Sequence, residues 1–402
     1  MTKGSTKVGL WGAIALVVAN MIGTGIFTSL GFQLEGVTSV FPIMLLWFIG
    51  GLTAFCGAVS YRQLIRYFPD SGGETYFVSQ LYRKQASYLT GVITLIFGFS
   101  APIALSALAF ANYLIPTTLC NAAIVASALV IGISVMHSID IRTSSRLQAI
   151  SSGFKVVVLL IFIGFGLSAG NQGAVRIQPS DRDMDAIFTV PYMLSFMYVH
   201  YAFSGWNASV YIFREIKQNT ILYRSLFFSV ALVTVLYMLL NFVFLTSSGI
   251  AQLKGVVEVG EVAAKNIFGS TIGRAFSVVI ALLLVSGISA MVWAGSRVSM
   301  KVEELFRGTI SLVEIPRKHI VIQALVSILF IWIVNFETIL ALTSVVLSLC
   351  SVSVVLGLFI HDKRQADRAE LSLFVKICAI GYCLVISTSN LYLFYAAVMA
   401  YV

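Results

Sequence analysis

The stretch Asn20-Met21-Ile22-Gly23-Thr24-Gly25-Ile26-Phe27 places two glycines in the middle of an apolar run. No Lys, Arg, Asp or Glu occurs between residues 8 and 34, a length sufficient for one helix to cross a bilayer. Each glycine costs about 1 kcal/mol relative to Ala in a helix interior, so helical hydrogen bonding is weakest there. Because lipid cannot satisfy freed backbone groups, a break at this depth must lie inside protein or along a water-filled cavity. The stretch therefore predicts a discontinuous helix that forms the wall of a binding site, with a close-packing face of small residues as the alternative.

The composition is that of an integral membrane protein. Hydrophobic residues make up 58% of the 402 residues and charged residues 11%, with a mean hydropathy of +0.94, which soluble domains do not reach. The net charge of +9 has no basic patch with interleaved aromatic residues, so no nucleic-acid partner is expected. The five cysteines form no CxxC pair, so we expect neither a disulfide framework nor a metal site, and no motif indicates a cofactor.

Charge-free runs predict an all-α protein with two units of five membrane helices. The first unit covers residues 1–170, the second covers 187–360, and residues 371–402 follow as a C-terminal addition. The expected helices are 8–34, 38–61, two within 85–139, 148–169, 187–213, 225–248, 271–296, 319–335, 338–360 and 371–387. Residues 391–402 would reach only about 18 Å of the roughly 30 Å that a crossing needs, so they predict either a partial twelfth helix or a chain that has been cut.

The loop charges predict the orientation. Lys and Arg are distributed roughly four to one in favour of the side that carries the N-terminus, which predicts a cytoplasmic N-terminus. Those on the other side are Arg176, Arg182, Lys254, Lys265 and Arg274. This asymmetry also accounts for the net positive charge.

A second interruption occupies the corresponding place in the second unit. Tyr201-Ala202-Phe203-Ser204-Gly205-Trp206-Asn207 puts small and polar residues inside the sixth apolar crossing. Five crossings per unit give the two units opposite orientations, and paired interruptions in such an inverted repeat indicate a site near the middle of the membrane.

These motifs resemble the amino acid/polyamine/organocation superfamily of LeuT-fold transporters, and within it the permeases akin to the L-type amino acid transporters. Gly23 to Phe27 is similar to the family's G-S/T-G-I-F signature, and Phe203 to Asn207, with Glu215-Ile216-Lys217 after it, to the family's helix 6. Pro69 to Glu74 resembles the P-x-S-G-G loop, and Phe110 to Tyr113 the end of helix 3. The chain departs from the family in two places. Thr220 replaces the usual proline, and 297–307 lacks the A-R-D-G ending.

The resemblance implies a LeuT-type 5+5 inverted repeat with discontinuous helices 1 and 6, plus one or two extra C-terminal helices. It implies a secondary active transporter that carries amino acids across a cytoplasmic membrane, here of bacterial style, by alternating access. An integral membrane enzyme and a channel are not expected, because no catalytic constellation and no repeated pore filter occur.

An α-amino acid is a zwitterion, so its site must bind a carboxylate and an ammonium group. The break at Gly23 offers amides of Thr24, Gly25 and Ile26 for the carboxylate, and carbonyls of Met21 and Ile22 for the ammonium. The resemblance implies the same roles. Carbonyls of Tyr201 and Ser204 in the sixth helix would also bind the ammonium, and the resemblance implies Tyr201 as an aromatic cover. Phe203 and Trp206 could form walls of the side-chain pocket, with plain packing as the alternative.

Lys155 is a charged residue in the middle of the fifth helix, where insertion costs about 3 kcal/mol. It resembles the lysine that replaces a bound cation in sodium-independent relatives. We therefore expect its ammonium near Gly23 and near Ser286 or Ser289 of helix 8, with snorkelling to the cytoplasmic face as the alternative.

No Asp or Glu falls in the middle of a predicted helix. We therefore expect neither a carboxylate proton relay nor a carboxylate sodium site, so that proton coupling would use Lys155 or His200, and we expect His200 to be a packed residue. The absence of an acid from the predicted pocket favours neutral L-amino acids. Exchange and proton-linked transport both stay open, and the alternatives are a sodium-coupled symporter of the same fold or a polyamine or cationic amino acid permease.

Cys120 lies in the turn where heteromeric L-type transporters carry the cysteine that is bonded to their heavy subunit. A single cysteine is weak evidence for such a bond, so a heavy-chain partner is not expected. The expected partners are an amino acid substrate and the lipid bilayer.

Overall fold

The computed structural model describes residues 8–115, 121–139, 141–176, 178–308, 315–364 and 371–401. The first half contains α1 (Leu10–Met21), α2 (Thr24–Gly36), α3 (Val40–Tyr67), α4 (Gly73–Leu81), α5 (Lys84–Ile93), the π-helix η1 (Thr94–Ser100), α6 (Ala101–Leu114), α7 (Ala122–Ile139) and α8 (Ile141–Ala169). The second half contains α9 (Asp181–Ile187), α10 (Val190–Phe203), α11 (Ala208–Tyr211), the 3-10 helix η2 (Phe213–Glu215), α12 (Asn219–Ser248), α13 (Ile250–Leu253), α14 (Val259–Phe268), α15 (Ser270–Arg307), α16 (Arg317–Ile333), α17 (Phe336–Arg364) and α18 (Leu373–Tyr401).

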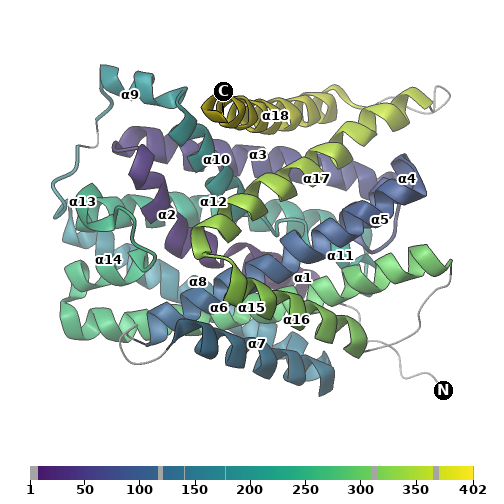
Figure 1. Ribbon diagram of the computed structural model, residues 1–402, viewed down its shortest axis with the longest axis horizontal. Coiled ribbons are helices and arrows are strands. Elements are labelled where there is room, and N and C mark those ends of the chain that lie inside the picture. The colour runs from purple at the N-terminus through teal and green to yellow at the C-terminus, as the bar shows by residue number, and fades with distance from the viewer. Residues whose placement is uncertain are drawn as a thin grey trace.

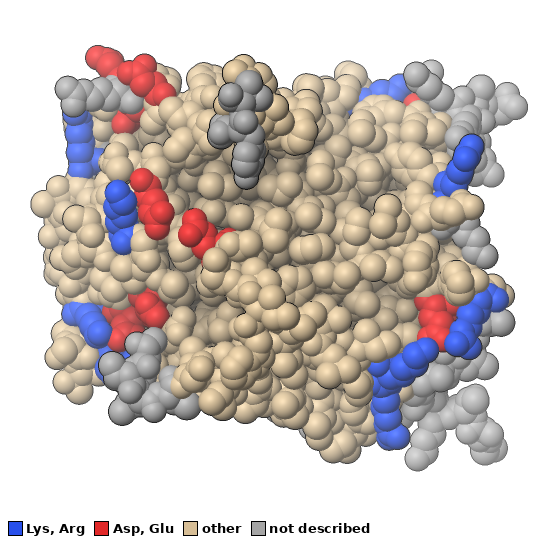
Figure 2. All heavy atoms as spheres, viewed as in Figure 1, with Lys and Arg blue, Asp and Glu red and all other residues tan. Residues whose placement is uncertain are grey.

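The protein is a multi-pass membrane protein. Within the described ranges, 8 helical spans are long and apolar enough to cross a bilayer, and the apolar 153–169 part of α8 adds a shorter one. The spans run between two ends of the molecule, with α9, α13 and α14 at one end and α4 at the other (Figure 1). Figure 2 shows most of the charged side chains of this face near those two ends, with a broad uncharged region between them. This distribution fits a bundle whose middle lies in hydrocarbon.

Both predicted helix breaks are confirmed. The first span is divided into α1 and α2 at Ile22 and Gly23, and the sixth into α10 and α11 by the non-helical residues 204–207. The two breaks also face each other. A Cβ on Gly25 would lie 2.4 Å from the Cα of Ala202, and Gly205, with φ +93°, lies against the backbone of Asn20. Glycine is required at both positions because backbone approaches backbone there.

The third span contains a π-helical turn that we did not expect. The range Gln85–Leu114 forms one membrane span, but residues Thr94–Ser100 have π-helical hydrogen bonding. Such turns occur frequently at functional sites because they displace side chains from the regular helical positions. Thr94, Gly98 and Phe99 of this turn line the cavity described below.

The expectation of a separate partial helix at 391–402 is wrong. The described chain continues as one helix, α18, from Leu373 to Tyr401. The polar residues between the two expected segments bond back to the preceding turn, with Ser389 donating to the Val385 carbonyl (2.9 Å) and Asn390 to that of Ile386 (2.9 Å). Helical side chains that satisfy themselves in this way do not end a helix. α18 packs along α3 at the edge of the bundle (Figure 1).

Candidate substrate site

A cavity of about 80 Å³ lies at the two breaks. This is several times the space that one water molecule requires, so the cavity can hold water or a small polar solute. Both breaks, η1, α17 and α18 contribute to the lining, which includes Asn20, Met21, Gly23, Thr24, Gly25, Glu74, Thr94, Phe99, His200, Tyr201, Ser204, Trp206, Asn207, Tyr211, Cys350 and Tyr382.

The start of α2 provides the anion-binding end of the cavity. Gly23 is the residue before the first turn and offers no side chain to cap the helix, so the first amides of α2 have no side-chain cap. A helix N-terminus of this kind favours a carboxylate. The Thr24 hydroxyl lies 3.1 Å from the Tyr201 hydroxyl, which places the expected covering residue directly beside the break.

The end of α1 already has hydrogen-bond donors. The Met21 carbonyl accepts from the Tyr237 hydroxyl (2.5 Å), whose single hydrogen is also within reach of the Ala202 carbonyl (3.0 Å). The Ile22 carbonyl accepts from the Lys155 ammonium (2.5 Å). A carbonyl oxygen has two lone pairs, so each can accept one further donor from a substrate. The sequence did not single out Tyr237, because it lies in an ordinary apolar run of α12.

Lys155 is fully buried and does not snorkel to the membrane surface. Its ammonium reaches the end of α1, next to Gly23, as expected. Ser286 and Ser289 lie on the neighbouring α15, which is the eighth of the predicted membrane helices. Ser289 hydrogen-bonds His137 (2.8 Å), and Ser286 donates to the Leu283 carbonyl (2.9 Å). A charge at this depth needs polar partners, and the broken helix provides one.

Some of the predicted site residues do not line the cavity. Trp206 does, but Phe203 packs between Trp47 and Tyr237, with ring centroids 6.1 Å and 5.0 Å away. Ile22 and Ile26 are also outside the lining, although their backbone belongs to the break. His200 lies in the lining, with its ring centroid 6.3 Å from that of Tyr382.

The expectation that the pocket contains no acidic group is wrong, because Glu74 lines the cavity and is 5% exposed. It accepts hydrogen bonds from Tyr61 (2.8 Å), Asn207 (2.5 Å) and Tyr211. Burial raises the pKa of Glu74 above its ordinary value, and the hydrogen bonds offset only part of this shift. We placed Glu74 in a charged loop, since its sequence neighbours are polar.

The turn at Gly72 and Gly73 explains how a loop residue becomes buried. Both glycines have positive φ, +115° and +54°, and a Cβ on Gly73 would lie 2.1 Å from the ring of Tyr211. Only glycine fits this approach. The glycine pair in Gly72-Gly73-Glu74 therefore indicated a tight turn. The sequence alone did not show that Tyr211 packs against this turn.

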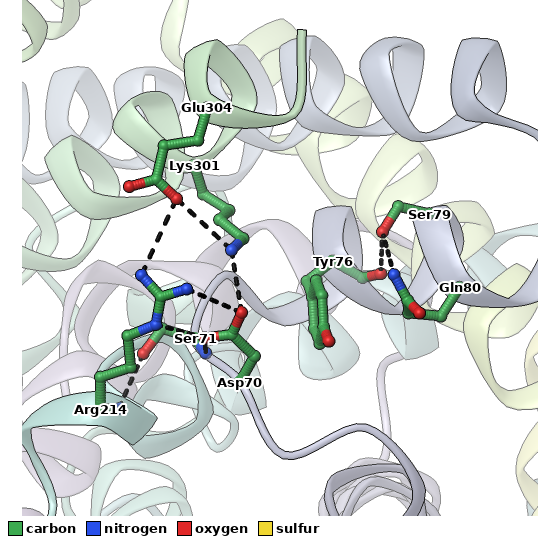
Figure 3. A network of polar contacts seen from close by, with 8 residues as sticks. All are labelled: Asp70, Ser71, Tyr76, Ser79, Gln80, Arg214, Lys301 and Glu304. Carbon is green, nitrogen blue, oxygen red and sulfur yellow. Dashed lines mark hydrogen bonds and ion pairs between the residues drawn. The ribbon is translucent and has the colours of Figure 1, made fainter. Parts of the chain in front are cut away.

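An ionic cluster lies on the other side of this turn and joins three segments (Figure 3). Asp70 pairs with Arg214 of η2 (2.5 Å) and Lys301 of α15 (2.9 Å), and Glu304 lies 3.4 Å from Lys301 and 3.8 Å from Arg214. Burial would raise the pKa of Asp70, but hydrogen bonds from Arg214 and Lys301 outweigh it and hold the pKa below its ordinary value. The cluster therefore holds these three segments together.

No group of three or more potential metal ligands occurs within the described parts of the chain. Cys120, on which a heavy-subunit bond would depend, lies outside the described residues.

Two discontinuous helices that face each other around a small polar cavity, in an all-helical membrane bundle, define a transporter of the LeuT fold. A solved structure shares this fold. The crystal structure of MhsT in complex with L-phenylalanine superposes with a TM-score of 0.70, covering 98% of this chain and 100% of that chain at 15% identity. The chain belongs to the amino acid permease family, whose profile matches residues 8–402.

Relatives with established names are transporters, not enzymes. The human (Homo sapiens) Asc-type amino acid transporter 1 is 27% identical over 306 residues, which cover 72% of this chain and 58% of the relative. The mouse (Mus musculus) large neutral amino acids transporter small subunit 2 is 25% identical over 304 residues, 72% of this chain and 57% of the relative. The chain thus spans less than two thirds of the length of these proteins.

Proposed function

We propose that this protein is a secondary active transporter of amino acids that works by alternating access without sodium. The observation that carries the proposal is the contact between the Lys155 ammonium and the Ile22 carbonyl at the end of α1. A fixed ammonium there takes the place that a bound sodium ion would occupy beside a broken helix. The names of the relatives support amino acids as the substrate class.

The substrate's two charged groups would bind at the two half-helix ends. Its carboxylate would accept from the amides of Thr24, Gly25 and Ile26, beneath the Tyr201 hydroxyl. Its ammonium would donate to the remaining lone pairs of Met21 and Ile22, and to carbonyls of Tyr201 and Ser204. Trp206 would contact the side chain.

Neutral L-amino acids are the first candidate, supported by the name of the large neutral amino acids transporter. A second candidate is a cationic amino acid or polyamine, which Glu74 in the cavity lining favours. Exchange and proton-linked uptake are the two modes compatible with a fixed ammonium at Lys155.

We further propose a bacterial cytoplasmic membrane with the N-terminus inside, on the basis of the loop charges, and action without a heavy-chain partner. The two five-helix units are assigned to 1–170 and 187–360, with α18 as an addition.

Uptake into proteoliposomes tests the function. L-Serine, L-leucine, L-phenylalanine and L-lysine are supplied with and without sodium, and with or without the same amino acid inside. We expect saturable uptake of at least one of them at equal rates in sodium and in choline. Uptake that requires sodium, or no uptake of any of the four, would contradict the proposal.

A further inference from the structure

Glu74 is the one buried acid in the lining of the cavity among the described residues, and the proposed binding of a zwitterion does not use it. It also lies outside the eight membrane spans, on the short helix α4. Its nearest partners Tyr61, Asn207 and Tyr211 are neutral donors, and no Lys or Arg of the described chain pairs with it. A buried carboxylate without a paired cation costs free energy, and this cost favours the protonated, neutral form of the side chain.

The surroundings of Glu74 contain no competing charge. α3 contributes Tyr61, α11 contributes Tyr211, α17 contributes Cys350 and α18 contributes Tyr382, all of which are neutral at ordinary pH. α5 presents Ser87, whose hydroxyl donates to the Thr75 carbonyl. α15 presents Lys301, whose ammonium is engaged by Asp70 and Glu304. The lining also contains the imidazole of His200 and the hydroxyl of Tyr201.

The hydrogen bonds of Glu74 fit both protonation states. Tyr61 and Asn207 both donate to Oε1, while Tyr211 alone donates to Oε2. When Oε2 carries a proton, Oε1 remains an acceptor for its two donors, and Oε2 can donate to the Tyr211 hydroxyl oxygen. That oxygen also accepts from Asn207 (3.2 Å), and it has two lone pairs. Only the Tyr211 hydroxyl hydrogen has to turn, so protonation breaks no other contact.

We propose that Glu74 Oε2 is the proton-binding site of the transport cycle, which makes the protein a proton-linked amino acid transporter. The inference rests on the proposed function. A proton from water in the cavity binds to Oε2, and the substrate then crosses the membrane while the Glu74 side chain is protonated and neutral. When Asn207 and Tyr211 move with α11 and water reaches Glu74 from the opposite side, the O–H bond breaks and the proton leaves to that water. The carboxylate is then restored, and the substrate is chemically unchanged.

The burial of Glu74 supports this order of events. Its pKa lies above the ordinary value while the side chain is enclosed, because burial disfavours the charged form. Hydration on opening removes that effect and favours release.

The test uses purified full-length protein in liposomes, with the membrane potential clamped and a pH-sensitive dye inside. The substrate is whichever of L-serine, L-leucine, L-phenylalanine and L-lysine exchanges fastest. With a gradient of one pH unit, acid outside, the unmodified protein is expected to accumulate substrate about tenfold and to acidify the lumen. Glu74→Gln is expected to exchange substrate but to accumulate none. Glu258→Gln, in the outer loop before α14, is the matched control and is expected to accumulate as the unmodified protein does.

The outcomes separate the two proposals. Accumulation and acidification by Glu74→Gln would overturn the role of Glu74. Exchange by the unmodified protein without any proton movement would also overturn it, while amino acid transport would stand. Absence of exchange with all four amino acids would overturn the proposed function itself.

Tyr61→Phe provides a second variant in case Glu74→Gln does not fold. Loss of one donor to the carboxylate should raise the pH midpoint of uptake by about one unit without abolishing exchange. An unchanged midpoint would contradict the proposal.

Discussion

The hydroxyl of Tyr237 lies 2.5 Å from the carbonyl oxygen of Met21, at the point where α1 ends. The same hydroxyl lies 3.0 Å from the carbonyl of Ala202, close to the end of α10. One side chain of α12 therefore contacts the C-terminal ends of both discontinuous helices, and its single hydroxyl hydrogen is shared by two carbonyls at those ends.

Tyr237→Phe should weaken transport more than it weakens the fold. Loss of the hydroxyl removes the one hydrogen that the Met21 and Ala202 carbonyls share, a cost of about 1–3 kcal/mol at the helix breaks, so uptake should fall by about tenfold or more. Initial uptake rates and thermal melting in detergent measure the two effects. Tyr392→Phe, whose hydroxyl bonds the Phe188 carbonyl at an exposed site, is the control. Equal rates for Tyr237→Phe and Tyr392→Phe would show that the contact is dispensable.

Lys155→Ala should abolish transport while the protein still folds. The variant removes the ammonium from the Ile22 carbonyl and leaves the end of α1 without its positive charge. Uptake in proteoliposomes, together with a monodisperse elution profile, checks this. Lys376→Ala, near the start of α18, removes a lysine whose side chain is 32% exposed and serves as the control. Full activity of Lys155→Ala would remove the assigned role.

Gly25→Ala should force α2 away from α10 at the point where the two helix breaks meet. The new methyl group would lie 2.4 Å from the Ala202 Cα, and backbone on both sides prevents simple repacking. We expect a loss of about 1–3 kcal/mol in stability and a loss of uptake. Gly164→Ala on α8, where nothing lies within 4 Å of the added Cβ, should melt and transport as the unmodified protein does. A Gly25→Ala protein with unchanged melting would contradict the packing described.

Asp70→Asn should destabilise the protein at neutral pH but not in acid. The pKa of Asp70 is below its ordinary value of 3.8 in the folded state, so its ionised form favours folding above that value. This contribution is lost as the pH falls through the lower, folded-state pKa. Because Asp70 is partly exposed, the effect at pH 7 should be modest, about 1 kcal/mol.

Thermal melting of both proteins at a series of pH values from neutral to acidic measures this difference. Asp185→Asn, an exposed residue at the other end of the molecule, is the control. A difference between Asp70→Asn and the unmodified protein that is the same across the series would contradict the pKa argument.

The sequence was sufficient to predict the breaks, because Gly23, Gly25 and Gly205 weaken a helix wherever they fall in an apolar run. It was also sufficient to place Lys155, since a mid-membrane lysine needs a polar partner. It was not sufficient for Glu74 or Tyr237. Their roles depend on which segments approach them in space, and both have ordinary neighbours along the chain.

The same limit applies to helix ends. Ser389 and Asn390 are compatible with a turn or with a continuing helix, and only their bonds to Val385 and Ile386 decide between the two. Similarly, the π-helical turn at Thr94–Ser100 could not be predicted from the hydrophobic pattern, because its residues belong to a continuous apolar run.

Asp70 and Glu74 are four residues apart, on either side of the Gly72-Gly73 turn, yet one belongs to the ionic cluster and the other to the cavity. The Gly72-Gly73 turn thus connects the ionic cluster to the cavity over four residues. Because Asp70 and Glu74 are so close along the chain, we expect a separation of Asp70 from Arg214 and Lys301 to displace Glu74 from Tyr211. Release of the ion pairs and hydration of the cavity would then be coupled.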